Sequence, residues 1–210
     1  SSRLKDQLTL MHGVLQKVAT IERDMTIDKS VEARLLGVVN DYSRHYHDRW
    51  TSVPKIGKRA KIMVVFDAPL WSDEIEGKLL SGKPYLSWTT ATNRLGLDHA
   101  DVYYTTLMKF VKEKDGQFET ADIGKCSEYL LREIEVLNPP VIVTMGSLAT
   151  RLIADDSKKK PAELAGKSIY DPTNDRTVIF GFNQGMLFFK PEMTADLEGC
   201  IRKAIEAAGL

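Results

Sequence analysis

The stretch KIMVVFDAPLWSDE, residues Lys61–Glu74, joins a strongly apolar run to an acidic loop. Ile62–Phe66 form the apolar run, which is short and rich in β-branched side chains. Such a run is typical of a strand that is buried on both faces of a sheet. It ends at Asp67, and the loop that follows contains two more acidic residues. Open α/β sheets build their ligand sites where strands end, so we expect a site in this loop.

The composition fits one medium-sized α/β domain. The chain has 210 residues, of which 43% are hydrophobic, and this is enough for a substantial core. Its 29 basic residues balance its 29 acidic residues. Any nucleic-acid binding therefore requires a locally basic surface, because the chain has no overall positive field. No apolar run approaches the roughly 20 residues of a membrane span, so we expect no membrane contact.

The cysteines and histidines predict no metal site and no cofactor. Cys126 and Cys200 lie far apart in the sequence without paired spacing, which is typical of a reduced, cytoplasmic protein. His45 and His47 are two residues apart, and on a helix they would diverge. The chain begins with Ser1 and has no initial methionine, which indicates an excised domain or residues left by cloning.

Hydrophobic periodicity predicts helices that alternate with strands. Two helices at residues 3–24 and 31–50 would form an N-terminal helical extension, residues 1–58, before an α/β domain at residues 59–210. We expect residues 155–176 to be a polar surface excursion. The predicted strands of the domain are 62–66, 102–108, 141–145 and 177–182, and its predicted helices are 87–97, 122–137, 147–153 and 194–208.

This order of elements predicts an α/β three-layer sandwich, with a four-stranded parallel sheet flanked by helices. Right-handed crossovers would bring the four strand ends to one edge of the sheet, where we expect a ligand. Those ends are Asp67–Glu74, Thr106–Lys109, Gly146-Ser147 and Asn183–Gly185. Gly146-Ser147 would also open a helix, and a helix N-terminus favours an anion such as phosphate.

The four strand ends, in this order, resemble the motifs of the uracil-DNA glycosylase superfamily, and in particular its iron–sulfur, thermophile-type branch. The resemblance covers roughly residues 60–206 and implies a four-stranded parallel sheet between helices. The family's G-E-A-P-G, E-D, G-x-P-F, V-Y-I-T-N-x-x-K, C-x-x-Y-L, P-x-V-I-V-x-L-G-x-x-A and T-x-H-P-S motifs fall on Phe66–Leu70, Asp73-Glu74, Gly82–Tyr85, Val102–Lys109, Cys126–Leu130, Pro140–Ala149 and Gly181–Gly185.

The chain departs from these motifs at positions that carry chemistry. Phe66 and Leu70 stand at the two loop glycines, and Thr106 stands where the family has the asparagine that reads uracil. Asn183 and Gln184 replace the histidine and proline of the last motif. Three of the four cysteines that hold the iron–sulfur cluster of this branch are missing, so we expect no cluster.

The resemblance implies a site for hydrolysis of the N-glycosidic bond of uracil. This reaction needs a pocket for a flipped base, a carboxylate near the oxocarbenium ion, and a donor to the departing base. By motif position, the predicted catalytic residues are Asp67, Asp73 and Asn183. The predicted base contacts are Ala68, Pro69, Tyr85 and Thr106, and the predicted DNA phosphate contacts are Gly146, Ser147, Gln184 and Gly185.

Each candidate also has a purely structural interpretation. Asp67 can cap the loop backbone, and Asp73-Glu74 can be a solvated acidic turn. Tyr85 and Trp71 can be half-buried aromatic residues, and Thr106 an ordinary strand residue. The threonine is a poor substitute for an amide that bonds uracil twice, because losing such a pair costs about 1–3 kcal/mol of base discrimination.

We favour a uracil-DNA glycosylase-like DNA-binding domain with impaired catalysis that serves DNA replication or repair. Its expected partners are DNA, single- or double-stranded, and a phage-type DNA polymerase or another replication protein, in the cytoplasm of a bacterium or a phage-infected host. The alternative is an active, divergent DNA glycosylase that acts on uracil or a modified pyrimidine. A third interpretation, a small-molecule α/β enzyme such as a nucleotide hydrolase, is weakened because the chain has no Gly-rich phosphate loop.

Overall fold

The computed structural model describes residues 1–154 and 159–210. In this part of the chain, the centre is a six-stranded sheet with the order β1-β3-β2-β4-β6-β5. The four inner strands are parallel, as predicted: β3 (Val102–Thr106), β2 (Ile62–Phe66), β4 (Val141–Met145) and β6 (Arg176–Phe180). The two outer strands are antiparallel to their neighbours: β1 (Lys55–Ile56) and β5 (Ser168–Asp171).

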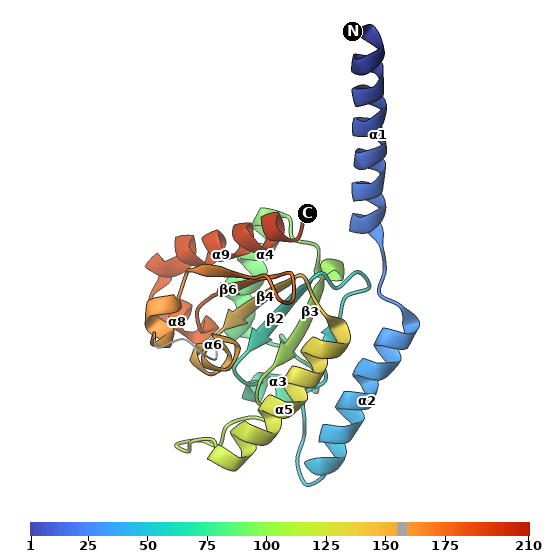
Figure 1. Ribbon diagram of the computed structural model, residues 1–210. Helices are drawn as coiled ribbons and strands as arrows, with labels where there is room; N and C mark the ends of the chain where they lie inside the picture. Colours follow the sequence, from blue (N-terminus) through green and yellow to red (C-terminus); the bar gives the residue numbers. More distant parts are fainter. Residues whose placement is uncertain (155–158) are drawn as a thin grey trace.

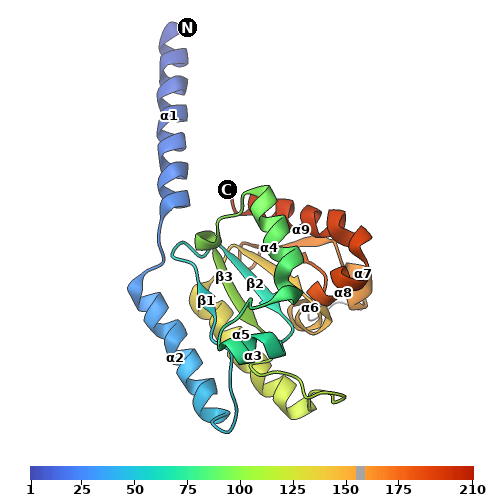
Figure 2. The same ribbon diagram turned by 180° about the vertical axis from the view of Figure 1, so that it is seen from behind.

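Helices cover both faces of the sheet, as Figures 1 and 2 show. One hydrophobic core lies under α2 (Lys29–His45), α5 (Thr120–Leu137), α6 (Ser147–Ala154) and α7 (Pro161–Leu164). The other lies under α4 (Leu86–Leu95), α8 (Gln184–Phe189) and α9 (Thr194–Ala207). The remaining helix of the described domain is α3 (Trp71–Glu76), and 3-10 turns lie at Lys83–Tyr85, His99–Asp101 and Pro191–Met193. The predicted sheet with helices on both faces is thus confirmed.

The elements that the sequence analysis missed are all short or exposed. β1 has 2 residues, α7 has 4, and α3 and α8 have 6 each, which is too short for a periodic hydrophobic pattern. β5 has 4 residues, three of them exposed, and it extends the sheet by pairing with β6. Two of these elements, α7 and β5, lie in the segment 155–176 that was predicted to be a surface excursion.

The two N-terminal helices differ in how they relate to the α/β core. α2 packs on α5 and buries Leu35, Val38, Val39 and Tyr42. α1 (Ser2–Asp24) extends away from the domain in both views and has no buried residue. The apolar side chains of α1, such as Leu10 at 70% exposure, are therefore in solvent. The division into residues 1–58 and 59–210 stays a prediction. Within residues 1–58, α2 and the segment after it contribute to the core, whereas α1 does not.

Removal of residues 1–25 is expected to leave the domain folded, because no side chain of α1 is buried. The melting temperature should change by less than about 2 °C, since about 1 kcal/mol corresponds to 2–4 °C for a domain of this size. Thermal unfolding followed by circular dichroism measures this, with the full chain as the reference. A fall of the melting temperature well beyond this range would show that α1 contributes to the stability of the core.

Candidate functional site

The carboxyl ends of the four inner strands meet at one edge of the sheet, and a cavity of about 680 Å³ opens there. Its walls include residues 67–71, most of the loop 111–118, and the start of α6. A second cavity of about 310 Å³ adjoins it, because Ser147 and Asn183 line both. Of the predicted site residues, the larger cavity brings together Asp67, Ala68, Pro69, Ser147 and Asn183.

Asp67 is half-buried, and its carboxylate caps the first turn of α6. Its Oδ1 accepts a hydrogen bond of 2.8 Å from the backbone N–H of Ala149. Burial raises the pKa of the Asp67 carboxyl, while the backbone N–H groups at the start of α6 oppose this rise. The carboxylate is therefore both a structural cap and a wall of the cavity.

Gly146 allows the close approach of Asp67 to α6. Its φ is 150°, and a Cβ on it would lie 2.3 Å from the Asp67 Cγ, so a larger residue would displace the carboxylate. The N-terminus of α6 thus already holds a carboxylate of the protein itself. A DNA phosphate at Gly146 and Ser147 would meet a neighbour of like charge, and phosphate binding at these two residues remains a prediction.

Asp73 does not line the cavity, although it follows Asp67 by six residues. Its side chain is 0% exposed. Oδ2 accepts hydrogen bonds from the Leu70 backbone N–H, at 2.8 Å, and from the Tyr85 hydroxyl, and Oδ1 accepts one from the Ser81 backbone N–H at 2.9 Å. These bonds hold the start of α3 to the loop after it. In this arrangement Asp73 is a buried structural acceptor.

Tyr85 packs in the core instead of facing the cavity. It is 1% exposed, and its ring lies 5.4 Å from that of Phe66 in an edge-to-face arrangement. Trp88 and Tyr104 complete the aromatic cluster, at 6.2 and 6.4 Å from Phe66. Burial raises the pKa of the Tyr85 hydroxyl, and its hydrogen bond to Asp73 raises it further. All four rings are buried, and none is open to a stacking base.

Thr106 is also closed off, with 0% exposure. Its hydroxyl lies 3.1 Å from the Ser52 hydroxyl, and its backbone carbonyl accepts a 2.5 Å hydrogen bond from the Lys109 ammonium group. The hydroxyl and the backbone carbonyl of Thr106 are thus used within the protein. Thr106 lines neither of the two cavities at the strand ends.

Asn183 is exposed and stands between the two cavities. Its Oδ1 caps α8 by accepting a 2.8 Å hydrogen bond from the Gly185 backbone N–H. The cap uses the carbonyl oxygen, which leaves the side-chain NH₂ group as a donor for a ligand. The Gly185 backbone N–H therefore orients the Asn183 side chain. The side chain of Gln184 lies outside the described part of the structure.

The sequence analysis missed the ionic cluster beneath this edge. Lys109 and Glu133 are both 0% exposed, and their Nζ and Oε2 atoms lie 2.5 Å apart. Glu133 Oε1 also accepts hydrogen bonds from Tyr103, at 2.8 Å, and from Thr105, at 2.6 Å. One signal was present in the sequence, because Glu133 follows Leu130 by three residues and so falls on the apolar face of a predicted helix.

The loop 111–118 forms one wall of the larger cavity. It contributes Lys112, Lys114 and the ring of Phe118. Trp71, which lines the same cavity, is 54% exposed. Cations that contact a phosphate backbone, with aromatic rings on which bases stack, are typical of single-strand binding surfaces. Glu113 and Asp115 share the loop, so the surface is mixed in charge.

The described residues do not fit an iron–sulfur cluster of the kind that the resemblance implies. Cys126 is buried, and its thiol lies 3.8 Å from the Tyr46 hydroxyl. Phe110, at the position of another cluster cysteine, packs 5.0 Å from the Tyr46 ring. In the described part of the chain, no group of three or more His, Cys, Asp or Glu is arranged to hold a metal ion.

The described helices include none that is long and apolar enough to cross a membrane.

Comparison with known proteins gives one family and two kinds of relative. The family model for the uracil DNA glycosylase superfamily matches residues 54–190. The chain is 30% identical over 215 residues to the DNA polymerase III subunit alpha of Yersinia pestis, which covers 97% of this chain and 17% of that protein. It is 25% identical over 170 residues to the type-4 uracil-DNA glycosylase of Archaeoglobus fulgidus, covering 75% of this chain and 82% of the glycosylase.

A DNA polymerase of Bacillus phage SP01 is 24% identical over 128 residues, which cover 58% of this chain. The chain spans only 14% of that polymerase and 17% of the Yersinia pestis subunit. The match to the Yersinia pestis subunit extends over both N-terminal helices, because it covers 97% of the chain, whereas the family model begins at residue 54.

Proposed function

Because the chain belongs to the uracil DNA glycosylase superfamily, we propose that it is a DNA-binding domain in which base excision is impaired. The larger cavity at the strand ends would hold a DNA strand. The domain would serve DNA replication or repair, next to a DNA polymerase.

The observation that carries this proposal is the closed aromatic cluster at the end of β2. A flipped base needs an open pocket with an exposed stacking ring and paired polar contacts. Here the Phe66 ring packs against Tyr85, and both are buried in the core. Thr106, at the position of the family's uracil-reading asparagine, is buried and bonded to Ser52. Admitting a base would require these side chains to leave the core.

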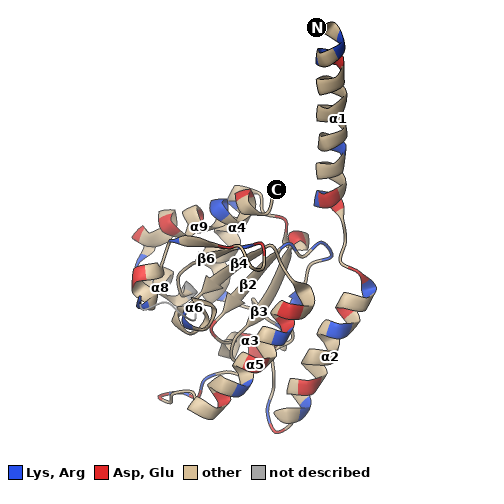
Figure 3. Cartoon of the chain, viewed as in Figure 1, with Lys and Arg blue, Asp and Glu red and all other residues tan. Residues whose placement is uncertain are grey.

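DNA binding is supported by the groups that remain open in the cavity. Lys112 and Lys114 can contact phosphates, and Trp71 and Phe118 offer rings beside them. Asn183 adds an exposed amide donor. The chain is neutral overall, with basic and acidic residues interspersed (Figure 3), and Asp67, Glu113 and Asp115 also line the cavity. The two lysines would therefore have to contact phosphates directly, and we expect affinity that falls with salt.

A role beside a DNA polymerase is supported by the relatives. Two of them are named DNA polymerases, and the match to the Yersinia pestis subunit includes α1 and α2. These helices lie before residue 54, where the glycosylase family model starts. On this proposal the domain works in the cytoplasm of a bacterial or phage-infected cell.

One observation favours a second candidate, an active but divergent glycosylase. Asp67 and Asn183 line the same cavity. A carboxylate there would position a water or stabilise the oxocarbenium ion, and an amide would donate to the departing base. In this reading Asp73 would act only through the loop that it holds.

We expect uracil-containing single- and double-stranded oligonucleotides to bind without forming abasic sites, because the base pocket is closed. Alkaline cleavage of labelled oligonucleotides measures excision, and fluorescence anisotropy over a salt series measures binding. A type-4 uracil-DNA glycosylase serves as the positive control for excision.

Two outcomes would change the proposal. Clear formation of abasic sites that is lost in Asp67→Asn and Asn183→Ala would establish the second candidate instead. Failure to bind either oligonucleotide at low ionic strength would count against both candidates, because each requires DNA in the cavity.

A further inference from the structure

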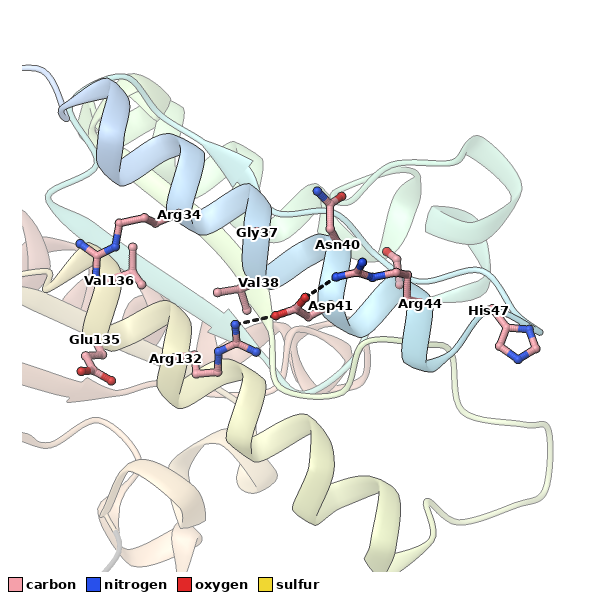
Figure 4. A pocket seen from close by; sticks show the side chains of 11 residues that line it. Arg34, Gly37, Val38, Asn40, Asp41, Arg44, His47, Arg132, Glu135 and Val136 are labelled. Atoms are coloured by element: carbon pink, nitrogen blue, oxygen red, sulfur yellow. Dashed lines mark hydrogen bonds and ion pairs between the residues drawn. The ribbon is translucent and has the colours of Figure 1, made fainter.

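A groove of about 870 Å³ runs between α2 and α5, away from the strand-end cavities (Figure 4). α2 and the turn after it contribute Arg34, Arg44 and His47, and α5 contributes Arg132. Among the residues that line the groove, the carboxylates are Asp41 and Glu135. Three arginines against two carboxylates leave a local charge of +1 with His47 neutral, in a chain whose total is zero.

Asp41 forms ion pairs with two of these arginines, one through each oxygen. Its Oδ1 lies 2.7 Å from Arg44, on the same helix, and its Oδ2 lies 2.7 Å from Arg132, across the groove. Figure 4 shows the two guanidinium groups on opposite sides of this carboxylate. Hydrogen bonds from Arg132 and Arg44 lower the pKa of Asp41, so the pairing keeps it ionised.

The shared carboxylate leaves both arginines with donors to spare. A guanidinium has five N–H groups, and each arginine uses one of them on Asp41. Arg34 takes part in no ion pair within the described part of the chain. Two guanidinium groups that share one carboxylate, with Arg34 further along the same groove, match the geometry of phosphate oxygens better than lysines would.

Aromatic contacts relate the end of α2 to the loop that lines the larger strand-end cavity. His47 lies at one end of it, and two residues later the Arg49 guanidinium lies 4.4 Å from the centre of the Phe110 ring. Phe110 packs on Phe118 at 5.7 Å, and Phe118 lines the larger cavity. Phe110 is itself buried, at 7% exposure, so these rings fix the end of α2 relative to the loop 111–118, while the exposed cations, Arg49 among them, would have to contact the strand between the two depressions.

We propose that the groove between α2 and α5 binds phosphate groups of a DNA strand that extends beyond the strand-end cavity. This inference rests on the proposed function, because it assumes that a DNA strand is bound in the larger strand-end cavity. One wall of the groove, α2, lies outside the family match at residues 54–190, and the other wall, α5, lies within it. A strand carries one phosphate per nucleotide and supplies charges at both depressions.

The test compares two pairs of arginines that share a carboxylate. The groove variant carries Arg44→Gln and Arg132→Gln, which share Asp41. The control variant carries Arg94→Gln and Arg202→Gln, which share Glu198 between α4 and α9. Both remove two charges from exposed side chains. Anisotropy would follow single-stranded DNA of about 5 and about 20 nucleotides, because site sizes on such surfaces run from about 4 to 16 nucleotides.

We expect the groove variant to bind the long oligonucleotide about tenfold more weakly than the unmodified chain. The slope of log affinity against log salt should fall by roughly 1.4, from about 0.7 for each lost phosphate contact. The short oligonucleotide, which reaches only the cavity, should bind all variants equally. The control variant should match the unmodified chain with both lengths.

Several results would overturn the inference. The groove variant could keep its affinity and salt slope for the long oligonucleotide and still bind the short one. That result would show that the groove does not bind DNA, and it would leave the proposed function intact. If neither oligonucleotide binds the unmodified chain, the groove proposal and the proposed function are both wrong. Polyglutamate binding that is lost in the groove variant, without any effect of the variant on DNA, would assign the groove to an acidic protein segment instead.

Discussion

Lys109→Met is expected to lower the free energy of unfolding by about 3–5 kcal/mol, because it leaves a buried carboxylate without its cation. Lys109 and Glu133 are both 0% exposed, and the Nζ to Oε2 distance is 2.5 Å. Water does not reach Glu133 to replace the lost charge. Urea unfolding of the variant and the unmodified chain measures the difference, which should appear as a lower midpoint at similar slope.

The double variant Lys109→Met with Glu133→Leu separates the pair from the packing around it. Replacing both ends of a buried ion pair with apolar residues is often neutral, so the double variant should recover most of the loss. Two hydroxyls complicate the recovery, since Tyr103 and Thr105 both donate to Glu133. A single variant that loses less than about 1 kcal/mol would contradict the account, because it would mean that Glu133 is readily neutralised or solvated.

The cluster also shapes the candidate site, because Lys109 bonds the backbone carbonyl of Thr106 at 2.5 Å. That bond fixes the turn in which β3 ends. Tyr42 of α2 lies over the same ammonium group, 5.2 Å from its ring centre, and donates to the Ser52 carbonyl. α2 is thereby connected to the strand-end edge through polar contacts as well as through its apolar face.

The inner sheet could be predicted from sequence because its strands are continuous apolar runs between helical patterns. Ile62–Phe66 and Val141–Met145 were predicted with the observed bounds. A strand that is buried on both faces is apolar along its whole length, so it can be recognised from its own sequence without knowledge of its neighbours. The edge strands β1 and β5 form because they pair with β3 and β6. Such pairing leaves no hydrophobic pattern in the sequence of a short, polar segment.

The candidate site could be predicted only as a region. Strand order placed Asp67 and Asn183 at one edge, and they do line one cavity. Sequence gave no means to know which way a loop side chain points. Asp67 turns to α6 because Gly146, with a φ of 150°, leaves room for it, whereas Tyr85 turns into the core to meet Phe66. Such directions depend on contacts between segments far apart in the chain.

The second large effect is expected at Asp73. Asp73→Ala should destabilise the chain by about 3–5 kcal/mol, because it leaves three donors without their acceptor and each buried unsatisfied donor costs about 1–3 kcal/mol. The donors are the backbone N–H groups of Leu70 and Ser81 and the hydroxyl of Tyr85. Urea unfolding measures the loss. Glu74→Ala, at the next residue, is the matched control and should stay within about 0.5 kcal/mol of the unmodified chain.

Asp73→Asn tests whether this carboxylate has a chemical role beyond its structural one. The amide keeps one oxygen acceptor but turns an NH₂ group towards a backbone or hydroxyl donor, so we expect this variant to lose stability as well. Asp67→Asn keeps an oxygen for the Ala149 N–H and changes the cavity wall, with a smaller expected loss. If the unmodified chain excises uracil and Asp73→Asn loses this activity with unchanged unfolding, Asp73 is not purely structural, because a buried cap cannot affect chemistry while leaving the fold's stability intact.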